Sequence, residues 1–145
     1  NITDWLNIEF ESSLSNPCNS GAALYLNGEL LNELVIPENT AKINNYAFFG
    51  CNSITTITLN NQLNIIGDYA FANCSTTSSL NIPDSVRTIG TAIINNSGIT
   101  KAYVNQTHIW TVRIPSTGAK NGTVNFAKGY NIANDLTRID KYYTY

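Results

Sequence analysis

One short segment of the chain recurs with the same internal spacing. INNYAFFGC spans residues 43–51, and its counterpart IIGDYAFANC ends at Cys74. The motif Tyr-Ala-Phe begins at Tyr46 in the first copy and at Tyr69 in the second, an offset of 23 residues. Cys51 and Cys74 are separated by the same offset. Such a recurrence indicates either a duplicated functional site or packing that repeats because the architecture repeats.

The offset of 23 residues extends well beyond this motif. Further apolar pairs that share it are Leu31 and Ile54, Leu34 and Ile57, Ile36 and Leu59, Ile43 and Ile66, and Phe48 and Phe71. A third copy continues with Leu80, Ile82, Pro83, Ile89 and Gly90. A fourth strand, opened by Ile99, Ala102 and Val104, fits if one residue is deleted. So many matches at one offset indicate a repeat protein, and a period of 23 residues lies within the range of leucine-rich repeats.

Each copy predicts one short strand of a parallel sheet. The predicted strands are LNELVIP at 31–37, ITTITLN at 54–60 and TSSLNIP at 77–83. Apolar residues alternate in each, as they do when one sheet face is buried. Outside the strands, Phe48 and Phe71 are predicted to point into the core, with Ile94 in the same place of the third copy. Tyr46 and Tyr69 are expected to bury their rings and leave their hydroxyls at the surface.

Two sets of positions exchange Gly and Asn, which adopt positive φ more readily than other residues. These sets are Asn44, Gly67 and Gly90, and Gly50, Asn73 and Asn96. We therefore predict two left-handed corners in each repeat.

These residues resemble the BspA-like leucine-rich repeats, whose unit reads approximately L-x-x-I-x-I-P…I-G-x-Y-A-F-x-G-C. The resemblance covers roughly residues 4–104, and upstream of the repeats DWLNIEF and LYLNGELLNELVIP are similar to the strand and hairpin that precede such repeats. It implies a β-rich, right-handed solenoid with short parallel strands on one face, turns and short helical turns elsewhere. It also implies a secreted or cell-surface protein linked to adhesion, without a catalytic residue in the repeat.

We expect a single domain over residues 1–145 that is capped at both ends, because a solenoid exposes its core there. Residues 1–30 are predicted to form an N-terminal cap with a β-hairpin at Asn27-Gly28, in which apolar mass from Trp5, Ile8 and Phe10 covers the first coil. Residues 31–104 hold about three repeats plus a fourth strand. Residues 105–145 match no repeat pattern, and we expect a β-rich C-terminal cap there, with a strand from Ile109 to Ile114.

The chain offers few residues for catalysis. His108 is its only histidine, so a Ser-His-Asp or Cys-His arrangement would have to include it. It lies outside the repeats that hold Cys51 and Cys74, and there is no G-x-S-x-G motif. We expect a structural or exposed histidine, and we predict no enzyme, no catalytic residue and no cofactor.

The three cysteines form no C-x-x-C pair, which argues against a zinc site. Cys51 and Cys74 are expected to stack with parallel side chains, which leaves their Cβ atoms about 5 Å apart, against about 3.8 Å in a disulfide. Buried free thiols are therefore predicted, including Cys18. The acidic residues are too dispersed for a catalytic carboxylate pair, and segment 131–135 lacks the calcium-loop pattern, so no metal site is predicted.

Composition limits the possible partners. Charged residues make up 12% of the chain, about half the usual share, while Asn, Ser and Thr number 22, 11 and 16. Such a surface is common in secreted or cell-surface β-rich proteins. The net charge is −2 and the eight Lys and Arg form no run, so we expect no nucleic acid. Apolar runs fall far below the roughly 18 residues that span a bilayer, which excludes helical membrane insertion. The lack of Met predicts a processed product or an excised domain.

If the chain binds a partner, strand residues between the buried ones define the surface. They form two columns on the concave face: Glu33, Thr56, Ser79 and Lys101, and Val35, Thr58, Asn81 and Tyr103. These columns predict many weak contacts that repeat along the array of strands. Such contacts would suit an adhesion or binding module for an extracellular protein or carbohydrate. The alternative is a structural spacer or capping domain of a larger surface protein, with no ligand of its own. Tyr142, Tyr143 and Tyr145 form another contact patch or belong to the C-terminal cap.

Overall fold

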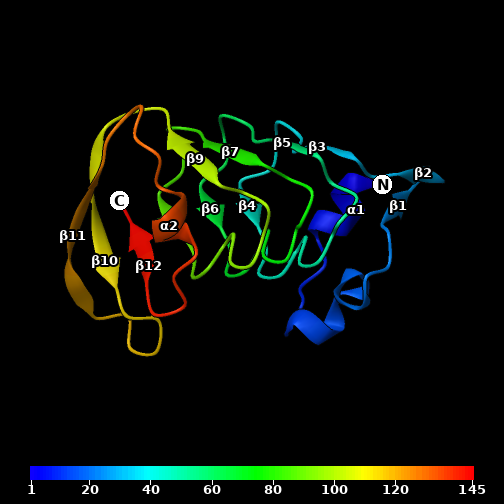
Figure 1. Ribbon diagram of the computed structural model, residues 1–145, viewed down its shortest axis with the longest axis horizontal. Helices are drawn as coiled ribbons and strands as arrows, with labels where there is room; N and C mark the ends of the chain where they lie inside the picture. The colour runs from blue at the N-terminus through cyan, green and yellow to red at the C-terminus, as the bar shows by residue number, and fades with distance from the viewer.

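The computed structural model describes residues 1–145 and shows a stack of three coils between two terminal segments (Figure 1). The coils are residues 31–53, 54–76 and 77–98, followed by a fourth strand. The first strands of the coils and this fourth strand lie in one row: β3 (Glu33–Val35), β5 (Thr56–Thr58), β7 (Ser79–Ile82) and β9 (Lys101–Val104). A second row contains β4 (Lys42–Ile43), β6 (Ile65–Ile66) and β8 (Thr88–Ile89). The chain termini lie at opposite ends of the stack (Figure 1).

The first row confirms the predicted parallel strands, each shorter than its predicted range. β3 pairs with β5 and β7 pairs with β9, both parallel. β5 and β7 are not joined by a ladder, so the row consists of two two-stranded sheets. Ile57 and Leu59 are only half-buried, whereas Leu34 and Ile36 of the first coil are buried.

The second row was not predicted from the sequence, which indicated one strand per repeat where the structure has two. β4, β6 and β8 pair in parallel and continue into antiparallel strands of the C-terminal segment, in the order β11-β10-β12-β8-β6-β4. The added strands are β10 (His108–Arg113), β11 (Lys120–Phe126) and β12 (Tyr142–Thr144). Two-residue strands are too short to display alternation in a sequence.

Stacked aromatic rings follow the repeat through the core. Phe48 and Phe71 are fully buried and lie parallel, with ring centroids 5.8 Å apart, and Ile94 is buried in the third coil, as predicted. On the outer side of the same corner, the half-buried rings of Tyr46 and Tyr69 stack at 5.3 Å. The recurring motif is therefore a packing column within one core cluster of 31 buried residues.

Only one of the two predicted left-handed corners is correct. Its residues have φ values of 74°, 59° and 52° at Gly50, Asn73 and Asn96. The other corner lies two residues beyond the predicted one, with φ values of 59°, 55° and 52° at Tyr46, Tyr69 and Ala92. Glycine at 67 and 90 instead permits close approach between coils. A Cβ on Gly90 would lie 2.6 Å from Oδ1 and 2.7 Å from the backbone N of Asp68.

The N-terminal segment (residues 1–30) packs over the first coil. It contains α1 (Ile2–Leu6), 3₁₀ turns at Ser13–Ser15 and Pro17–Ser20, and the hairpin of β1 (Tyr25–Leu26) and β2 (Glu29–Leu30). The hairpin turns at Asn27-Gly28, as predicted. Trp5 Nε1 donates to the Ala47 carbonyl at 2.8 Å, and Asn16 Nδ2 donates to the Tyr46 carbonyl at 2.7 Å. These bonds tie the segment to the first Tyr-Ala-Phe corner.

Two expectations for this segment were wrong. The family resemblance implied a strand at residues 4–10, but α1 begins at Ile2, because the Asn1 side chain accepts the Asp4 N–H and caps the helix. Ile8 was expected to cover the first coil and is instead exposed. Leu6, one helical turn after Ile2, is buried in its place.

The C-terminal segment (residues 105–145) contributes β10, β11, the short helix α2 (Ala133–Leu136) and β12. The β-rich character and the strand near 109–114 were predicted, whereas α2 was not. Tyr143 is buried and its hydroxyl donates to the Asp135 carbonyl at 2.9 Å. Tyr142 is half-buried, and Tyr145 packs on His108 while 49% of its surface stays exposed.

Candidate binding surface

The two predicted columns lie on the solvent side of the first strand row. Four register pairs build them: Glu33 with Thr56, Val35 with Thr58, Ser79 with Lys101, and Asn81 with Tyr103. All eight side chains are exposed except that of Tyr103, which is half-buried. The pairing of Ser79 with Lys101 confirms the one-residue deletion in the third repeat, because these residues are 22 apart rather than 23.

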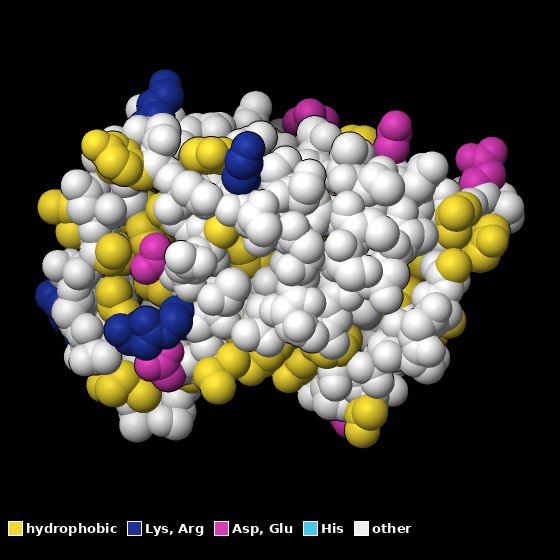
Figure 2. Space-filling view, in the orientation of Figure 1, with side chains coloured by type: hydrophobic (Ala, Val, Ile, Leu, Met, Phe, Trp, Pro, Cys, Tyr) yellow, Lys and Arg dark blue, Asp and Glu magenta, His cyan; other side chains and the backbone are white.

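The columns are not continuous along the row, because β5 and β7 do not pair. Tyr103, the one aromatic side chain of the columns, is half-buried. Val35, at the other end of the row, exposes 60% of its surface. Figure 2 shows few charged side chains over the middle of the coils, whereas acidic and basic side chains stand along the upper edge, where the first strand row runs (Figure 1).

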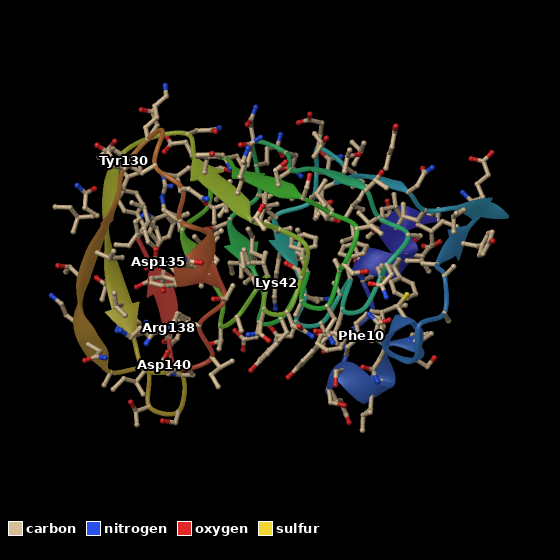
Figure 3. All side chains as sticks on the ribbon, in the orientation of Figure 1. Phe10, Lys42, Tyr130, Asp135, Arg138 and Asp140 are labelled. Carbon is tan, nitrogen blue, oxygen red and sulfur yellow. The ribbon has the colours of Figure 1, made fainter.

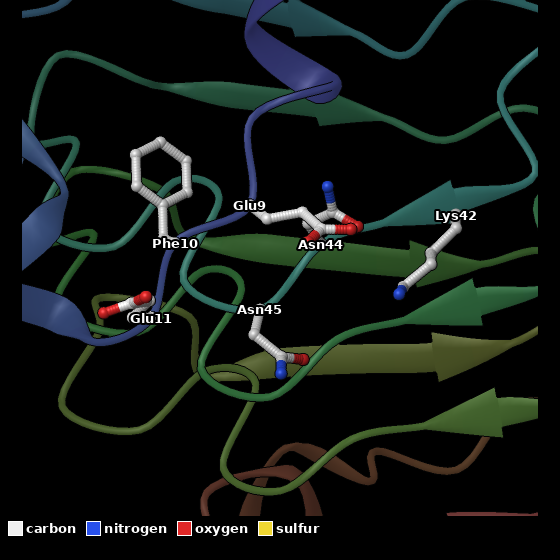
Figure 4. A pocket seen from close by; sticks show the side chains of 6 residues that line it. All are labelled: Glu9, Phe10, Glu11, Lys42, Asn44 and Asn45. Atoms are coloured by element: carbon white, nitrogen blue, oxygen red, sulfur yellow. The ribbon is translucent and has the colours of Figure 1, made fainter.

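A hollow that the sequence did not predict lies beside the second strand row. It holds about 260 Å³ and is lined by Glu9, Phe10, Glu11, Lys42, Asn44 and Asn45 (Figure 4). Asn44 Nδ2 donates to the carbonyls of Leu6 and Ile8, which holds the N-terminal segment against this edge. Glu9, Phe10 and Glu11 come from a non-periodic segment, and Lys42, Asn44 and Asn45 come from β4 and the turn after it, so the sequence gives no sign that the two groups meet.

His108 lies at the junction of the third coil with the C-terminal segment. Its Nε2 is 2.7 Å from Oδ1 of Asp84, and its ring packs on Tyr145 with centroids 4.2 Å apart. The guanidinium of Arg87 lies 4.7 Å from the centroid of the same tyrosine ring. No hydrogen bond joins His108 to a serine or cysteine side chain. The cluster therefore fastens Tyr145 to the third coil rather than activating a nucleophile.

The three cysteines are buried and none forms a disulfide, as predicted. A hydrogen bond between Cys18 and Cys51 lowers the pKa of the Cys18 thiol and raises that of Cys51, and burial raises the Cys51 pKa further. Burial raises the pKa of Cys74 to about 12. Cys51 and Cys74 are therefore protonated near neutral pH and unsuited to nucleophilic attack.

Charged groups elsewhere are dispersed. Arg138 donates from Nε and Nη2 to the two carboxylate oxygens of Asp140, at 2.9 and 2.8 Å, on the exposed side of the C-terminal segment (Figure 3). This hydrogen bonding lowers the pKa of Asp140. Nowhere do three or more His, Cys, Asp or Glu side chains gather in an arrangement that could hold a metal ion.

Comparison with protein families identifies the repeat. The family model described as "BspA type Leucine rich repeat region" matches residues 21–143, in six copies. The chain belongs to this family. The match begins at Gly21, after the segment 4–20 that the resemblance had included, and ends at Tyr143, well beyond its limit of residue 104. No curated protein and no solved structure matches the chain.

Membership in the BspA-type leucine-rich repeat family indicates a broad class of function. Repeats of this family suggest a protein-binding or adhesion-type module and are generally non-catalytic. Proteins that carry them are typically associated with a surface. None of the helices in this chain has both the length and the apolar character needed to cross a membrane.

Proposed function

We propose that the chain is a non-catalytic binding or adhesion module of a secreted or cell-surface protein, directed at an extracellular protein or carbohydrate. In this proposal it is one domain, a short right-handed solenoid whose N-terminal and C-terminal segments act as caps. Its binding face is the pair of columns on β3, β5, β7 and β9. The in-register array of exposed side chains supports the proposal, because identical spacing lets one partner meet equivalent positions on neighbouring coils.

The chemistry of the columns favours many weak contacts. Thr56, Thr58, Ser79 and Asn81 are small and neutral, so each offers hydrogen bonds without the desolvation cost of a charge. The end positions are larger: Val35 at one end, Lys101 and half-buried Tyr103 at the other. A partner that spans the row gains from both ends and from the polar middle.

The test is a screen of arrayed extracellular-matrix proteins and glycans with the full chain. A variant carrying Thr58→Ala, Asn81→Ala and Tyr103→Ala should lose binding to any ligand found. The matched control carries Asn121→Ala, Thr123→Ala and Asn125→Ala on β11, which changes exposed strand residues of similar type away from the columns. Thermal melts of both variants verify folding.

Binding that the β11 variant retains and the column variant loses supports this face. Binding that survives in a folded column variant contradicts it. If no ligand is found in either array, the alternative function is favoured, a structural spacer or capping domain of a larger protein.

A further inference from the structure

The first strand row ends differently at its two edges. At β9 the edge is occupied: the Asn131 side chain accepts the Ala102 N–H at 3.0 Å and donates to the Thr100 carbonyl at 2.7 Å. The Ile132 N–H also donates to the Ala102 carbonyl, at 2.9 Å. At the opposite edge, β3 pairs with β5 only and has no strand on its other side.

The free edge of β3 carries four unpaired backbone groups. The Asn32 carbonyl accepts from Thr55, and the Ile36 N–H donates to Thr58, so even-numbered residues direct their polar groups toward β5. Successive residues of a strand alternate in this direction, so the N–H and C=O of Glu33 and Val35 point away from β5. None of these four groups forms a hydrogen bond elsewhere in the chain.

A hollow of about 330 Å³ lies beside this edge, between β3 and the β1–β2 hairpin. Its apolar lining includes Ile2, Leu26, Leu30 and Leu34, and Leu34 lies on the face of β3 opposite to Glu33 and Val35. Leu30 is 42% exposed, which is high for an aliphatic side chain that lines a hollow. The hollow can therefore receive apolar side chains of a strand laid along β3.

The charge around the hollow is acidic. Glu29 and Glu33 are exposed on its rim, and neither forms an ion pair. The lining contains no Lys or Arg. A ligand that brings Lys or Arg to this rim gains attraction to two unpaired carboxylates.

We propose that β3 accepts an extended segment of a partner protein as an added strand, in which apolar residues alternate with Lys or Arg. The backbone of this segment pairs with the free groups of Glu33 and Val35. Its apolar side chains, on the face to which Leu34 points, enter the hollow, and its basic side chains, on the face that Glu33 and Val35 share, reach Glu33 and Glu29. A second copy of this chain is disfavoured, because pairing two β3 edges would bring these carboxylates together.

The probe is the acetylated and amidated peptide Val-Lys-Val-Lys-Val-Lys-Val, titrated into the full chain by calorimetry. A peptide with Glu in place of Lys serves as the charge control and should not bind. Two further peptides carry N-methyl groups on every Val or on every Lys. Because only one set of amides can face β3, one methylated peptide should retain binding and the other should lose it. Binding retained by both, or lost by both, overturns strand pairing.

Two substitutions at one position test the edge itself. Val35→Pro removes the outward N–H while leaving the pairing of β3 with β5 intact, since that N–H points away from β5. It should weaken peptide binding by about tenfold or more, whereas the matched variant Val35→Thr keeps the N–H and should bind like the original. If Val35→Pro fails to fold, the methylated peptides on the unaltered chain still decide the question.

The remaining variants separate the possible occupants. Glu33→Gln should weaken binding and reduce its dependence on salt concentration. The Thr58, Asn81 and Tyr103 variant should leave peptide binding unchanged, because these residues lie outside the edge and the hollow. Sedimentation of the unaltered chain is expected to show no association through β3. Self-association that Val35→Pro abolishes would overturn the proposed occupant in favour of a second copy.

Discussion

In the coils, equivalent residues make equivalent contacts with the next coil, whereas in the C-terminal segment unlike residues meet. The N–H groups of Tyr46 and Phe48 donate to carbonyls 22 residues later, those of Asp68 and Ala70. In the C-terminal segment, by contrast, Trp110 packs on Phe126 and Phe126 on Tyr143, at unequal separations along the chain. A period in the sequence thus reveals contacts only where the contacts themselves recur.

The C-terminal segment nevertheless occupies the place of a next coil. The Phe71 N–H donates to Ile93 of the third coil, and the Ile94 N–H donates in the same way to Leu136 of α2. β12 continues the second row on β8, and Ile132 continues the first row on β9. The two regions therefore share one hydrogen-bonding scheme, filled by repeated residues in one and by unrelated residues in the other.

The largest expected effect comes from the stacked core column. Phe71→Ala should lower the free energy of unfolding by about 3–5 kcal/mol, because it removes a fully buried ring stacked on Phe48. Urea titrations of the original chain, followed by tryptophan fluorescence and by circular dichroism, should give one common midpoint. Separate midpoints would mean that the coils and the C-terminal segment unfold independently.

A substitution that disturbs the close approach between coils should destabilise the fold less than the cavity left by Phe71→Ala. Gly90→Ala should destabilise the fold by about 2–3 kcal/mol, because the new Cβ meets the backbone of the neighbouring coil. Gly129→Ala is the control in the C-terminal segment, where nothing lies within 4 Å of the new Cβ and only the φ of +85° is unfavourable. It should cost about 1 kcal/mol. If urea titrations show that both variants lose the same free energy of unfolding, the steric explanation for Gly90 is contradicted.

The side chain that closes the edge of β9 should have a smaller effect. Asn131→Ala removes the partners of the Ala102 N–H and the Thr100 carbonyl, and should destabilise the fold by about 1–2 kcal/mol. Hydrogen exchange at the Ala102 amide should accelerate. Asn125→Ala, an exposed residue of β11 without a side-chain hydrogen bond, should change stability by less than about 0.5 kcal/mol. Unchanged exchange at Ala102 would count against this closure.

The smallest expected effect is a fall in the free energy of unfolding at alkaline pH, to which one buried group in each region contributes. Burial raises the pKa of Cys74 from 9.0 to about 12 and that of Tyr143 from 10.0 to about 12. The unfolded chain therefore releases protons that the folded chain retains, so the free energy of unfolding is full below pH 9 and falls between pH 9 and 12. Cys74→Ala should remove part of the fall that begins near pH 9, and Tyr143→Phe the part that begins near pH 10. A free energy of unfolding that stays constant from pH 9 to 12 would contradict both pKa shifts.

The same comparison explains which parts of the fold were predictable from the sequence. The first strand row, the Phe48–Phe71 column and the Asn-Gly hairpin were predictable, because each depends on recurring or local residues. The second strand row was not, because two residues cannot show a period. The register of the candidate residues within the pairs β3–β5 and β7–β9 was predictable from the period, whereas the open edge of β3 leaves no pattern in the sequence. It depends on which strands lack a neighbour, and only the fold shows that.

The central claim is that the C-terminal segment completes the stack, and a fragment of residues 1–104 tests it most directly. Without residues 105–145, the buried residues of the third coil and the edge of β9 are exposed to water. Sedimentation and urea unfolding of this fragment should show association or loss of the cooperative transition, beside a monomeric and cooperative full chain. A soluble, monomeric 1–104 fragment that unfolds cooperatively at the same midpoint as the full chain would contradict the claim.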